Sequence, residues 1–435
     1  MSGPRVLVVG QGGREHAILD ALHRSAARPR LHVAPGNPGM EPLAERVPMQ
    51  VTDVAGLTAW AKAQKPELVV IGPDAALAAG LADSMRGVGI ATLGPGREAA
   101  RLEWSKRYAK EILVRLHLPT AAFRVAESAE EAERLIEGAP YPLVLKADGL
   151  AAGKGVVIAR DSNEARATVD AWMRRGELGE AAKSIVVEEC LEGEEASVLV
   201  LTDGTRWLLF PPARDHKRIG DGDVGPNTGG MGACAPARVP SAAEAQRIAR
   251  RVVDPLLRAL REAGTPFQGV LYLGLMLTSS GPMVLEINAR FGDPEAQAVL
   301  PLLGEDVYPL FLAAARGALP ADRHGSPVVH RGAAVCVVLA APGYPGRPET
   351  GAAIEGLDGP WQDGLRVYCA GVERRGQQWI VSGGRVAGVT AHSETLERAR
   401  AAAYEAVRRI RFPGMQYRKD IALAPLSSGA LADER

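Results

Sequence analysis

Short apolar runs and glycine-containing turns alternate through the first hundred residues. The β-branched run at 5–9 predicts a buried strand, and the mixed polar and apolar stretch at 14–23 predicts the helix that follows it. Two more apolar runs, at 31–33 and 68–71, predict further strands. Because strand, glycine turn and helix follow one another in this order, we expect a parallel α/β sheet in a first domain at 1–100.

The next part of the chain has a different pattern. Apolar runs at 143–146 and 156–159 predict two strands, and the glycine-rich stretch between them, 147–155, predicts a loop. A helix at about 162–173 and a strand at 185–188 follow. These elements predict a small, compact unit of its own.

A glycine-rich stretch at 216–232 interrupts the second half of the chain. It contains six glycines and no periodic pattern, so we expect a long loop without regular secondary structure. A long loop inside a compact domain usually has a functional reason. A helix at 243–262 and strands near 270–277 and 283–288 follow, and the apolar run at 333–339 opens the C-terminal region.

Composition limits the classes of partner. Lys and Arg together number 51, as do Asp and Glu, so the chain has no charge excess to attract nucleic acid or an anionic membrane. No segment has about 18 uninterrupted apolar residues, and the N-terminus lacks a signal-peptide pattern. The four cysteines form no CxxC pair, which argues against a zinc site or a disulfide framework. We expect a cytoplasmic protein that binds neither nucleic acid nor membrane.

The turn after the first expected strand reads Gly10-Gln11-Gly12-Gly13. A dinucleotide fingerprint would need a third glycine where Glu15 stands and an acidic residue about 20 positions later, and neither is present. NAD binding is therefore not favoured, although this turn is the one feature that suggests a dehydrogenase. A single phosphate at the helix N-terminus, with Arg14 as its charge partner, fits the pattern. The alternative is a tight structural turn.

The loop 148–155 resembles a Walker A motif but lacks its spacing and its Ser or Thr, and a strand follows it instead of a helix. A glycine-rich flap between two strands can still close over a triphosphate. Lys154 in the loop and Lys146 on the preceding strand would supply positive charge, because a Lys in an apolar strand is costly to bury without an anionic partner. The alternative is an ordinary exposed Lys.

The strand at 284–288 carries the clearest metal signal. The two-residue period of a strand puts Glu286 and Asn288 on one face. A carboxylate and an amide oxygen suit Mg²⁺, which also keeps water and phosphate ligands. A structural hydrogen-bonded pair is the alternative. A charged turn follows directly, Arg290-Phe291-Gly292-Asp293-Pro294-Glu295, and it favours a functional site over a structural pair.

Five motifs in this order resemble the phosphoribosylamine–glycine ligase family of the ATP-grasp superfamily. They are VLVVGQGGREHA at 6–17, APGNPG at 34–39, LKADGLAAGKGVV at 145–157, DHKRIGDGD–GPNTGGMG at 215–232 and RFGDPE at 290–295. The resemblance runs from residue 6 to about residue 420, nearly the whole chain. Each motif alone would be weak, but several long motifs in the family's order are specific.

The resemblance implies a multidomain α/β and α+β protein with an ATP-grasp fold. An N-terminal parallel α/β domain would bind the substrate phosphate, and a mixed domain would lie at the C-terminus. The expected limits are 1–100 for the N-terminal domain, 101–120 with 191–327 for the central domain and its metal site, 121–190 for a small mobile flap domain, 328–425 for the C-terminal domain and 426–435 for a disordered tail.

The resemblance also implies a reaction. Glycine and 5-phosphoribosylamine would be joined through glycyl phosphate, with ATP converted to ADP and phosphate, in de novo purine biosynthesis. ATP and Mg²⁺ or Mn²⁺ would be required, and the partners would be the small-molecule substrates alone. The expected state is a monomer, with a weak dimer as the alternative.

Individual residues take roles from the same resemblance. The nucleotide-binding residues would be Lys106, Lys146, Gly153, Lys154, Gly155, Glu188, Glu189, Leu191 and Glu195. The metal ligands would be Glu286 and Asn288. The residues that bind the ribosylamine and glycine would be Gly12, Gly13, Arg14, Asn37, Gly39, Lys217, Asn227 and Gly292. The catalytic residues would be Asp215, Arg290 and Asp293.

The chain departs from the family's usual pattern in three places. Cys234-Ala235-Pro236 stands where the family has Tyr-Ser-Pro, Asp74 follows Gly72-Pro73 where it has Glu, and Cys369-Ala370-Gly371-Val372 stands for His-Ala-Gly-Thr. These changes affect contacts beside the glycine-rich stretch and leave the expected ATP and metal residues intact. The rival functions are another purine-pathway ATP-grasp ligase that uses bicarbonate, a dehydrogenase, and a binding module without activity.

Overall fold

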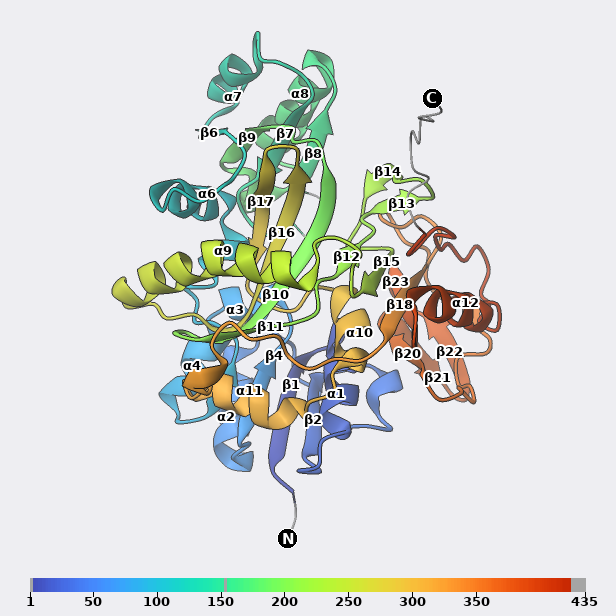
Figure 1. The fold of residues 1–435 in the computed structure, drawn as a ribbon. Coiled ribbons are helices and arrows are strands. Elements are labelled where there is room, and N and C mark those ends of the chain that lie inside the picture. Colours follow the sequence, from blue (N-terminus) through green and yellow to red (C-terminus); the bar gives the residue numbers. More distant parts are fainter. Residues whose placement is uncertain (1–2, 152–154, 424–435) are drawn as a thin grey trace, which may run out of the picture.

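The computed structural model describes residues 3–151 and 155–423. Its N-terminal part is a five-stranded parallel sheet in the order β3-β2-β1-β4-β5 (Figure 1, blue), which confirms the parallel α/β prediction. The strands are β1 (Arg5–Gly10), β2 (Arg30–Pro35), β3 (Glu45–Arg46), β4 (Leu68–Ile71) and β5 (Ala91–Leu93). The helices between them are α1 (Gly13–His23), α2 (Val54–Gln64), α3 (Asp74–Ala78) and α4 (Leu81–Gly87).

Strand β1 is apolar throughout because it is buried on both faces. Val6 and Val8 pack into one hydrophobic core, while Leu7 and Val9 pack into another on the opposite face of the sheet. All four side chains are 0% exposed. This double burial explains why the sequence shows a continuous apolar run there and not an alternating one.

A second sheet, in the order β6-β9-β7-β8, is antiparallel and forms the small unit at the top of Figure 1. Its strands are β6 (Phe123–Ala126), β7 (Leu143–Ala147), β8 (Val156–Ala159) and β9 (Ile185–Glu189), and its helices are α7 (Ala129–Ile136) and α8 (Ser162–Val169). The expected helix at 162–173 is therefore shorter, and a π-helical turn, Asp170–Arg174, completes it. The sheet packs on its own hydrophobic core.

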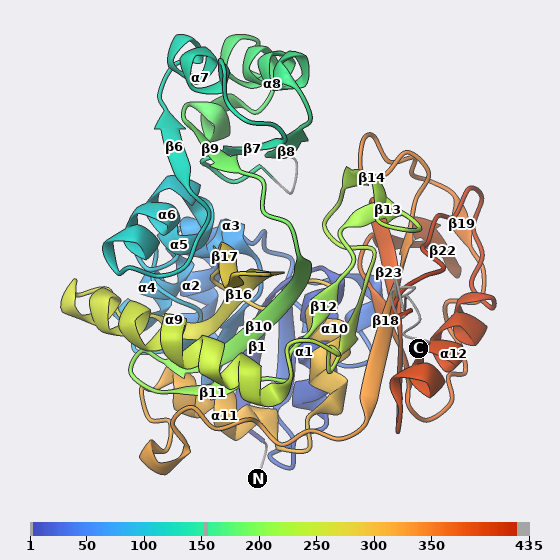
Figure 2. The ribbon, with the colours of Figure 1, turned by 45° about the horizontal axis from the view of Figure 1, so that its top comes forward.

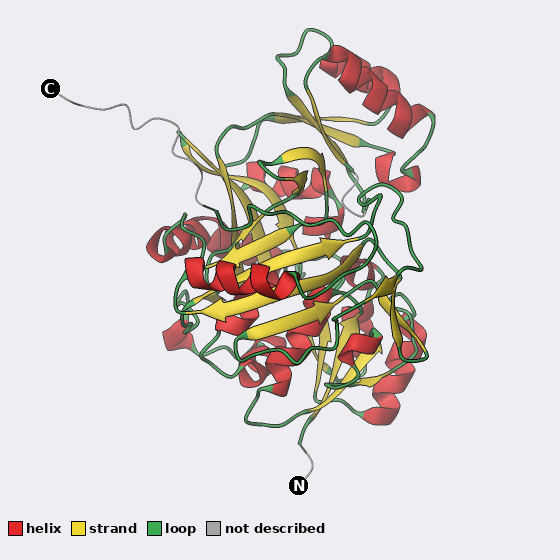
Figure 3. Ribbon diagram, turned by 90° about the vertical axis from the view of Figure 1, so that its right-hand side faces the viewer, coloured by secondary structure: helices red, strands yellow, loops and turns green. Residues whose placement is uncertain are grey.

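The central sheet is antiparallel, in the order β11-β10-β16-β17, with the long helix α9 (Ala242–Glu262) beside it (Figure 3). Its strands are β10 (Glu194–Asp203), β11 (Trp207–Leu209), β16 (Gln268–Thr278) and β17 (Gly281–Asn288). Helices α5 (Arg101–Trp104) and α6 (Lys106–Arg115) precede the small sheet, and α10 (Glu295–Val299) and α11 (Val307–Ala315) follow β17.

The C-terminal part is built on a sheet in the order β12-β15-β18-β23-β20. Its strands are β12 (Arg214–Asp215), β15 (Gly232–Ala235), β18 (Ala333–Ala340), β20 (Leu365–Cys369) and β23 (Arg385–Ser393). Helix α12 (Leu396–Val407) and a smaller sheet of β19 (Ala353–Ile354), β21 (Val372–Arg375) and β22 (Gln378–Val381) complete it. Strands β12 and β15 pair into this sheet although they precede β18 by about 100 residues, so the sheet does not follow the expected division at residue 328. The domain limits expected from the sequence therefore stay a prediction.

The glycine-rich stretch at 216–232 is not wholly irregular, contrary to the expectation. It contains a two-stranded hairpin of β13 (Arg218–Gly220) and β14 (Val224–Asn227). The turn between these strands has positive φ at Gly222 (72°) and Asp223 (56°), a conformation that glycine and Asp adopt more readily than other residues. Of the glycines that suggested a loop, Gly222 is thus a turn residue, whereas Gly220 and Gly225 lie in the strands of the hairpin. Within the described residues, every helix is too short or too polar to cross a membrane.

Candidate active site

A cavity of about 500 Å³, called the cleft below, is lined by residues of the small sheet, the central sheet and the segments on either side of the β13–β14 hairpin. Most of the residues that the sequence singles out line it. They are Arg14, Lys106, Lys146, Gly155, Glu188, Glu189, Leu191, Glu195, Asp215, Lys217, Asn227, Glu286, Asn288, Arg290, Gly292 and Asp293. Gly153 and Lys154 lie outside the described residues.

Two lysines share one buried carboxylate in the cleft. Lys146 Nζ on β7 and Lys110 Nζ on α6 each lie 3.0 Å from Glu188 Oε2. Lys146 also donates to the carbonyl of Leu285 at 2.9 Å, which links the small sheet to the central sheet. Burial lowers the pKa of Lys110 to about 8, although Glu188 opposes this shift. The two lysines and Glu188 leave a net positive charge, which suits a bound phosphate.

Glu286 and Asn288 both line the cleft from β17, as the alternation predicts. Lys217 Nζ lies 3.0 Å from Glu286 Oε1 and 3.7 Å from Glu195 Oε2. Lys217, with help from Lys106 and Lys146, holds the pKa of Glu286 well below its usual range. The carboxylate is therefore ionised, as a metal ligand must be.

The donor set around Glu286 fits a metal that is held partly by its substrate. Among the residues that the structure describes, no group of three or more His, Cys, Asp or Glu side chains could hold a metal ion. One carboxylate and one amide oxygen are a poor complete site, but they fit Mg²⁺, which takes its other ligands from water and phosphates.

Arg290 is held rigidly at the edge of the cleft. Its Nη2 lies 2.7 Å from Glu103 Oε1, and its Nη1 donates to the carbonyl of Phe291 at 3.0 Å. Glu103 Oε2 accepts from the backbone N–H of Ala289 at 2.8 Å, so the buried carboxylate braces both the guanidinium and the end of β17. An arginine fixed in this way can orient an anionic substrate.

Asp293 lies beside a second arginine, the half-buried Arg385. Arg385 Nη2 lies 3.0 Å from Asp293 Oδ2, and Gln297 Nε2 donates to Asp293 Oδ1 at 2.7 Å. Burial alone would raise the pKa of Asp293, but Arg385 and Arg14 outweigh it and the pKa is lowered. Asp293 is thus an ionised carboxylate. Its partner Arg385 was not expected at the site from the sequence.

The pKa of Asp215 is shifted in the opposite direction. Burial, and then the nearby carboxylate of Glu295, raise its pKa well above the usual range. Its Oδ1 has no hydrogen-bond partner among the described residues. A carboxyl group whose pKa is raised in this way can, in its protonated form, donate a hydrogen bond to a bound anion.

A backbone N–H of the N-terminal glycine turn already donates to a carboxylate of the helix that follows the turn. The N–H of Gly12 donates to Glu15 Oε2 at 2.7 Å, and Arg14 Nε lies 2.5 Å from Glu15 Oε1. Glu15 thus occupies the anion position that the sequence pattern offers to a phosphate. Arg14 still reaches the cleft, where its Nη1 donates to the carbonyl of Phe291.

Three other residues expected to bind the ribosylamine make contacts within the protein. The Asn37 amide donates to the carbonyls of Gln11 (2.8 Å) and Cys369 (2.9 Å) and accepts from the N–H of Gly39 (2.9 Å). A Cβ on Gly13 would lie 2.6 Å from Gln297 Nε2, and one on Gly39 would lie 2.4 Å from Cys369 Sγ. Close packing against helix α10 thus explains Gly13, and close packing against the end of β20 explains Gly39.

A second hollow of about 760 Å³ adjoins the cleft between those loops. It shares Asp293 and Arg385 with the cleft. Gly12 and Asn37 line it from the N-terminal side, together with Arg46, and Arg374 lines it from the C-terminal side. It is large enough for a sugar phosphate and carries cationic side chains at its edges.

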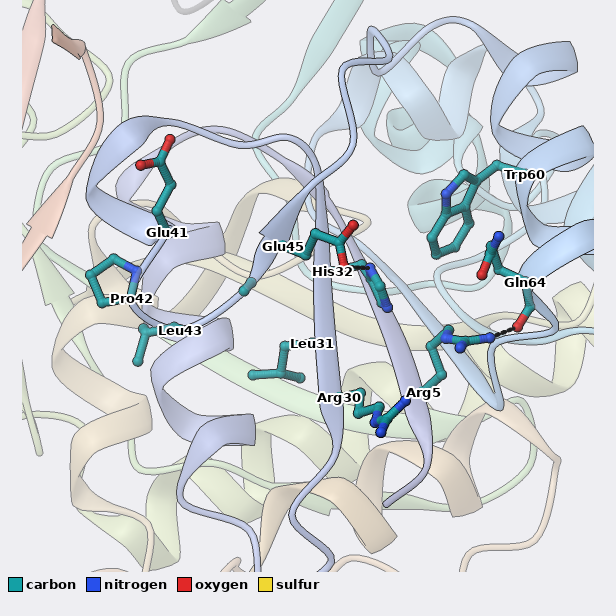
Figure 4. Close-up of a pocket in the computed structure, with 11 residues that line it drawn as sticks. Arg5, Arg30, Leu31, His32, Glu41, Pro42, Leu43, Glu45, Trp60 and Gln64 are labelled. Carbon is teal, nitrogen blue, oxygen red and sulfur yellow. Dashed lines mark hydrogen bonds and ion pairs between the residues drawn. The ribbon is translucent and has the colours of Figure 1, made fainter. Parts of the chain in front are cut away.

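A further hollow of about 530 Å³ lies at the amino ends of β1 and β2, and none of the expected site residues lines it (Figure 4). It is lined by Arg5, Arg30, His32 and Trp60, with Glu45 at its rim, 3.7 Å from His32 Nδ1. The glycine turn stands at the other end of β1. This hollow is therefore separate from the chemistry of the cleft.

Sequence reasoning missed several members of the site. They are Glu103, Lys110, Tyr272 and Arg385. Lys110 looks like any polar residue of an amphipathic helix, and Arg385 simply follows a Ser-Gly-Gly turn. Their burial comes from tertiary packing, and no local pattern in the sequence reports it.

Models of one protein family match the chain in three consecutive parts. The phosphoribosylglycinamide synthetase N domain matches residues 4–103, its ATP-grasp (A) domain matches 104–296 and its C domain matches 334–424. Together the three matches follow the order of the parts in the fold.

Named relatives are similar over almost their whole length. The phosphoribosylamine–glycine ligase of Caulobacter vibrioides is 46% identical over 417 residues, covering 96% of this chain and 97% of the relative. That of Mesorhizobium japonicum is 45% identical over 416 residues, with 96% and 97% covered. The crystal structure of the Thermotoga maritima phosphoribosylamine–glycine ligase superposes with a TM-score of 0.81 at 36% identity, covering 96% of this chain and 100% of that one.

A more distant structure shares the fold alone. The biotin carboxylase domain of the Hydrogenobacter thermophilus 2-oxoglutarate carboxylase, solved with MgADP and bicarbonate, has a TM-score of 0.74 at 17% identity. The likeness covers 96% of this chain and 92% of that domain. Together with the family match, it confirms the expected ATP-grasp fold.

Proposed function

This chain belongs to the phosphoribosylamine–glycine ligase family, and we propose that its cleft carries out that family's reaction. Glycine, 5-phosphoribosylamine and ATP give glycinamide ribonucleotide, ADP and phosphate, a step of de novo purine biosynthesis. The observation that carries this proposal is the meeting of Lys106, Lys146 and the ionised Glu286 in one cleft. Phosphoryl transfer needs such charge neutralisation and positioning more than covalent help from the protein.

The first half of the reaction is a phosphoryl transfer to glycine. An oxygen of the glycine carboxylate attacks the γ-phosphorus of ATP, the bond to ADP breaks, and glycyl phosphate forms. Lys106 and Lys146 would neutralise the phosphates, and the segment Glu188–Leu191, at the end of β9 and just after it, would lie against adenine. Glu195 would face the ribose hydroxyl groups.

The second half is an acyl transfer. The amine nitrogen of 5-phosphoribosylamine attacks the carbonyl carbon of glycyl phosphate, the carbon–oxygen bond to phosphate breaks, and the nitrogen loses a proton to the departing phosphate. The ionised Asp293 would orient the amine, and Asp215, whose pKa is raised, would in its protonated form donate a hydrogen bond to the acyl phosphate. Arg290 would hold the glycine carboxylate before transfer.

ATP and a divalent metal ion are the cofactors that an ATP-grasp ligase uses, and we propose Mg²⁺, or Mn²⁺ in its place. Glu286 and Asn288 would hold it, since they offer the oxygen donors that either ion prefers. When bound, the ion would neutralise charge on the phosphates of ATP.

We place 5-phosphoribosylamine in the second hollow, with its amine toward Asp293. Support comes from the wall that this hollow shares with the cleft and from its cations Arg46 and Arg374. Gly12 lines this hollow, but its N–H already donates to Glu15. The phosphate would therefore be held by Arg46 and Arg374 and not by the glycine turn.

The remaining expectations also stay proposals. The partners are the small-molecule substrates, and the protein is a monomer, with a weak dimer as the alternative. A reducing, cytoplasmic compartment is supported by the four cysteines, all of which are free.

The reaction is tested by ADP release from Mg²⁺-ATP, with 5-phosphoribosylamine generated in situ and glycine either added or omitted. We expect release only when both substrates are present. Release that depends on bicarbonate in place of glycine, as the biotin carboxylase likeness would allow, contradicts the assignment and keeps only the fold-level conclusion. Product mass identifies glycinamide ribonucleotide directly.

A further inference from the structure

The hairpin β13–β14 joins the two segments that form one wall of the cleft. Asp215 and Lys217 lie just before it, and Asn227 and Thr228 lie at its end. Figure 2 shows it above the end of β23, on the side of the small sheet. A two-stranded hairpin is only marginally stable by itself, so something must hold this one in place.

The anchor is a buried arginine near the end of the described chain. Arg418 is 1% exposed, and its Nε and Nη2 donate to the two oxygens of Asp420 at 2.7 and 2.6 Å. Its Nη1 lies 2.5 Å from Asp223 Oδ1, in the turn of the hairpin, and 3.2 Å from the carbonyl of Arg218 on β13. One guanidinium thus ties the hairpin to the C-terminal segment 418–422.

Backbone groups reinforce the same junction from both sides. The N–H of Gly222 donates to Asp420 Oδ2 at 2.8 Å, and the N–H of Lys419 donates to Asp221 Oδ1 at 2.7 Å. Further along, the N–H of Ala422 donates to His216 Nε2 at 3.4 Å. His216 stands between Asp215 and Lys217, so this contact reaches the wall of the cleft itself.

The C-terminal segment is in turn fixed to helix α12. Tyr404 Oη donates to the carbonyl of Arg418 at 2.8 Å and accepts from the N–H of Ile421 at 3.1 Å. Arg400 Nε donates to the carbonyl of Ile421 at 3.0 Å. A continuous chain of hydrogen bonds therefore runs from α12 through Arg418 to the hairpin.

At its other end, the hairpin holds the lysine that pairs with the expected metal ligand. Lys217 Nζ lies 3.0 Å from Glu286 Oε1. The carbonyl of Lys217 accepts both from the N–H of Thr228 at 2.7 Å and from its hydroxyl at 2.8 Å, which closes the hairpin at its base. A shift of the hairpin would thus move Lys217 relative to Glu286.

We propose that Arg418 is a positioning residue for the substrate wall. Through Asp223 and Asp420 it fixes the β13–β14 hairpin, and through the hairpin it fixes Lys217 and Thr228 where glycine is activated. The mechanical part of this proposal rests on contacts alone, while the kinetic part rests on the proposed function. Arg418 itself touches no substrate.

The test uses Asp223→Asn, because Asp223 is exposed on one side and Asn also accepts its positive φ, so the fold survives. Glu397→Gln is the matched control, since it removes one carboxylate of an exposed ion pair of similar length, with Arg238 at 2.9 Å, away from the hairpin. We expect Asp223→Asn to raise the KM for glycine roughly two- to fivefold, in line with a partly exposed pair. The KM for 5-phosphoribosylamine should stay unchanged, because no residue of the hairpin lines the second hollow, and Arg418→Ala should show a larger effect of the same kind.

Hydrogen exchange at 216–230 provides a readout that does not need activity. Faster exchange in Asp223→Asn and Arg418→Ala, with Glu397→Gln like the unmodified chain, supports the anchor even if the assigned reaction proves wrong. Unchanged exchange in both variants overturns the anchor. Faster exchange with an unchanged KM for glycine overturns the positioning role. If Arg418→Ala does not fold, Asp223→Asn decides alone.

Discussion

At the scale of single residues, Glu286 combines two tasks. It is the ionised carboxylate proposed to hold the divalent ion, and it is the ion-pair partner of Lys217 at 3.0 Å. We expect Glu286→Gln to lower kcat/KM by at least about a hundredfold, because an amide loses the charge that the metal requires. ADP release measured across a range of Mg²⁺ and Mn²⁺ concentrations, with thermal unfolding as the check on folding, tests this prediction.

Glu192→Gln is the control for that change, because Glu192 is an exposed carboxylate of the acidic run after β9 and does not line the cleft. It should leave the metal dependence as it is. Normal activity of Glu286→Gln at ordinary Mg²⁺ concentrations would rule out Glu286 as the metal ligand.

Arg374 tests the placement of the ribosylamine at the same scale. It lines the second hollow, whereas its neighbour Arg375 does not. We expect Arg374→Met to raise the apparent KM for 5-phosphoribosylamine about tenfold, the effect of losing one charge-assisted contact to phosphate. Arg375→Met should behave like the unmodified chain. An increase in the KM for ATP instead would place the sugar phosphate elsewhere.

At the scale of elements, the contact between the small sheet and the central sheet depends on Lys146. The register of β16 and β17 shifts between Gly274 and Leu275, and the carbonyl of Leu285 at this irregularity accepts from Lys146. We expect Lys146→Met to raise the KM for ATP by roughly ten- to a hundredfold, since it removes charge-assisted hydrogen bonds. Steady-state kinetics against ATP measures this change.

The fold should survive that substitution because Lys110 still pairs with Glu188 at 3.0 Å. Lys183→Met, which removes an exposed lysine near the start of β9, is its control. Equal ATP affinity in the two variants would show that Lys146 does not contact the nucleotide.

The elements also show what the sequence can and cannot predict. Strand β1 and the alternation of Glu286 and Asn288 follow from local periodicity, because burial imposes a repeat on neighbouring residues. The β13–β14 hairpin shows no such repeat in the sequence, because it is held in place by a contact with Arg418, about 200 positions away. Arg385 also comes to the site through a long-range contact, with Asp293, and its strand carries no chemical motif. Long-range packing is the part that one sequence does not display.

At the scale of the whole molecule, a buried histidine couples folding of the N-terminal and C-terminal parts to pH. His16 on α1 is buried, and its Nδ1 accepts from the N–H of Cys369 on β20 at 3.0 Å. Burial lowers its pKa from 6.5 to about 4, against the opposing effect of Asp20. Between pH 6.5 and pH 4, the His16 imidazole is protonated in the unfolded chain but stays neutral in the folded chain. The free energy of unfolding therefore falls as the pH falls.

We therefore expect His16→Asn to reduce the loss of unfolding free energy between pH 6.5 and pH 4, by at most about 3 kcal/mol at about 1.4 kcal/mol per pKa unit. His216, whose pKa burial also lowers to about 4, would keep part of the slope. Urea unfolding at several pH values measures it. His23→Asn, at the exposed end of the same helix, is the control for replacing a histidine on α1. If His16→Asn and the unmodified chain lost the same unfolding free energy over this pH range, protonation of His16 would not cause the loss. The acid sensitivity would then have to arise from other groups.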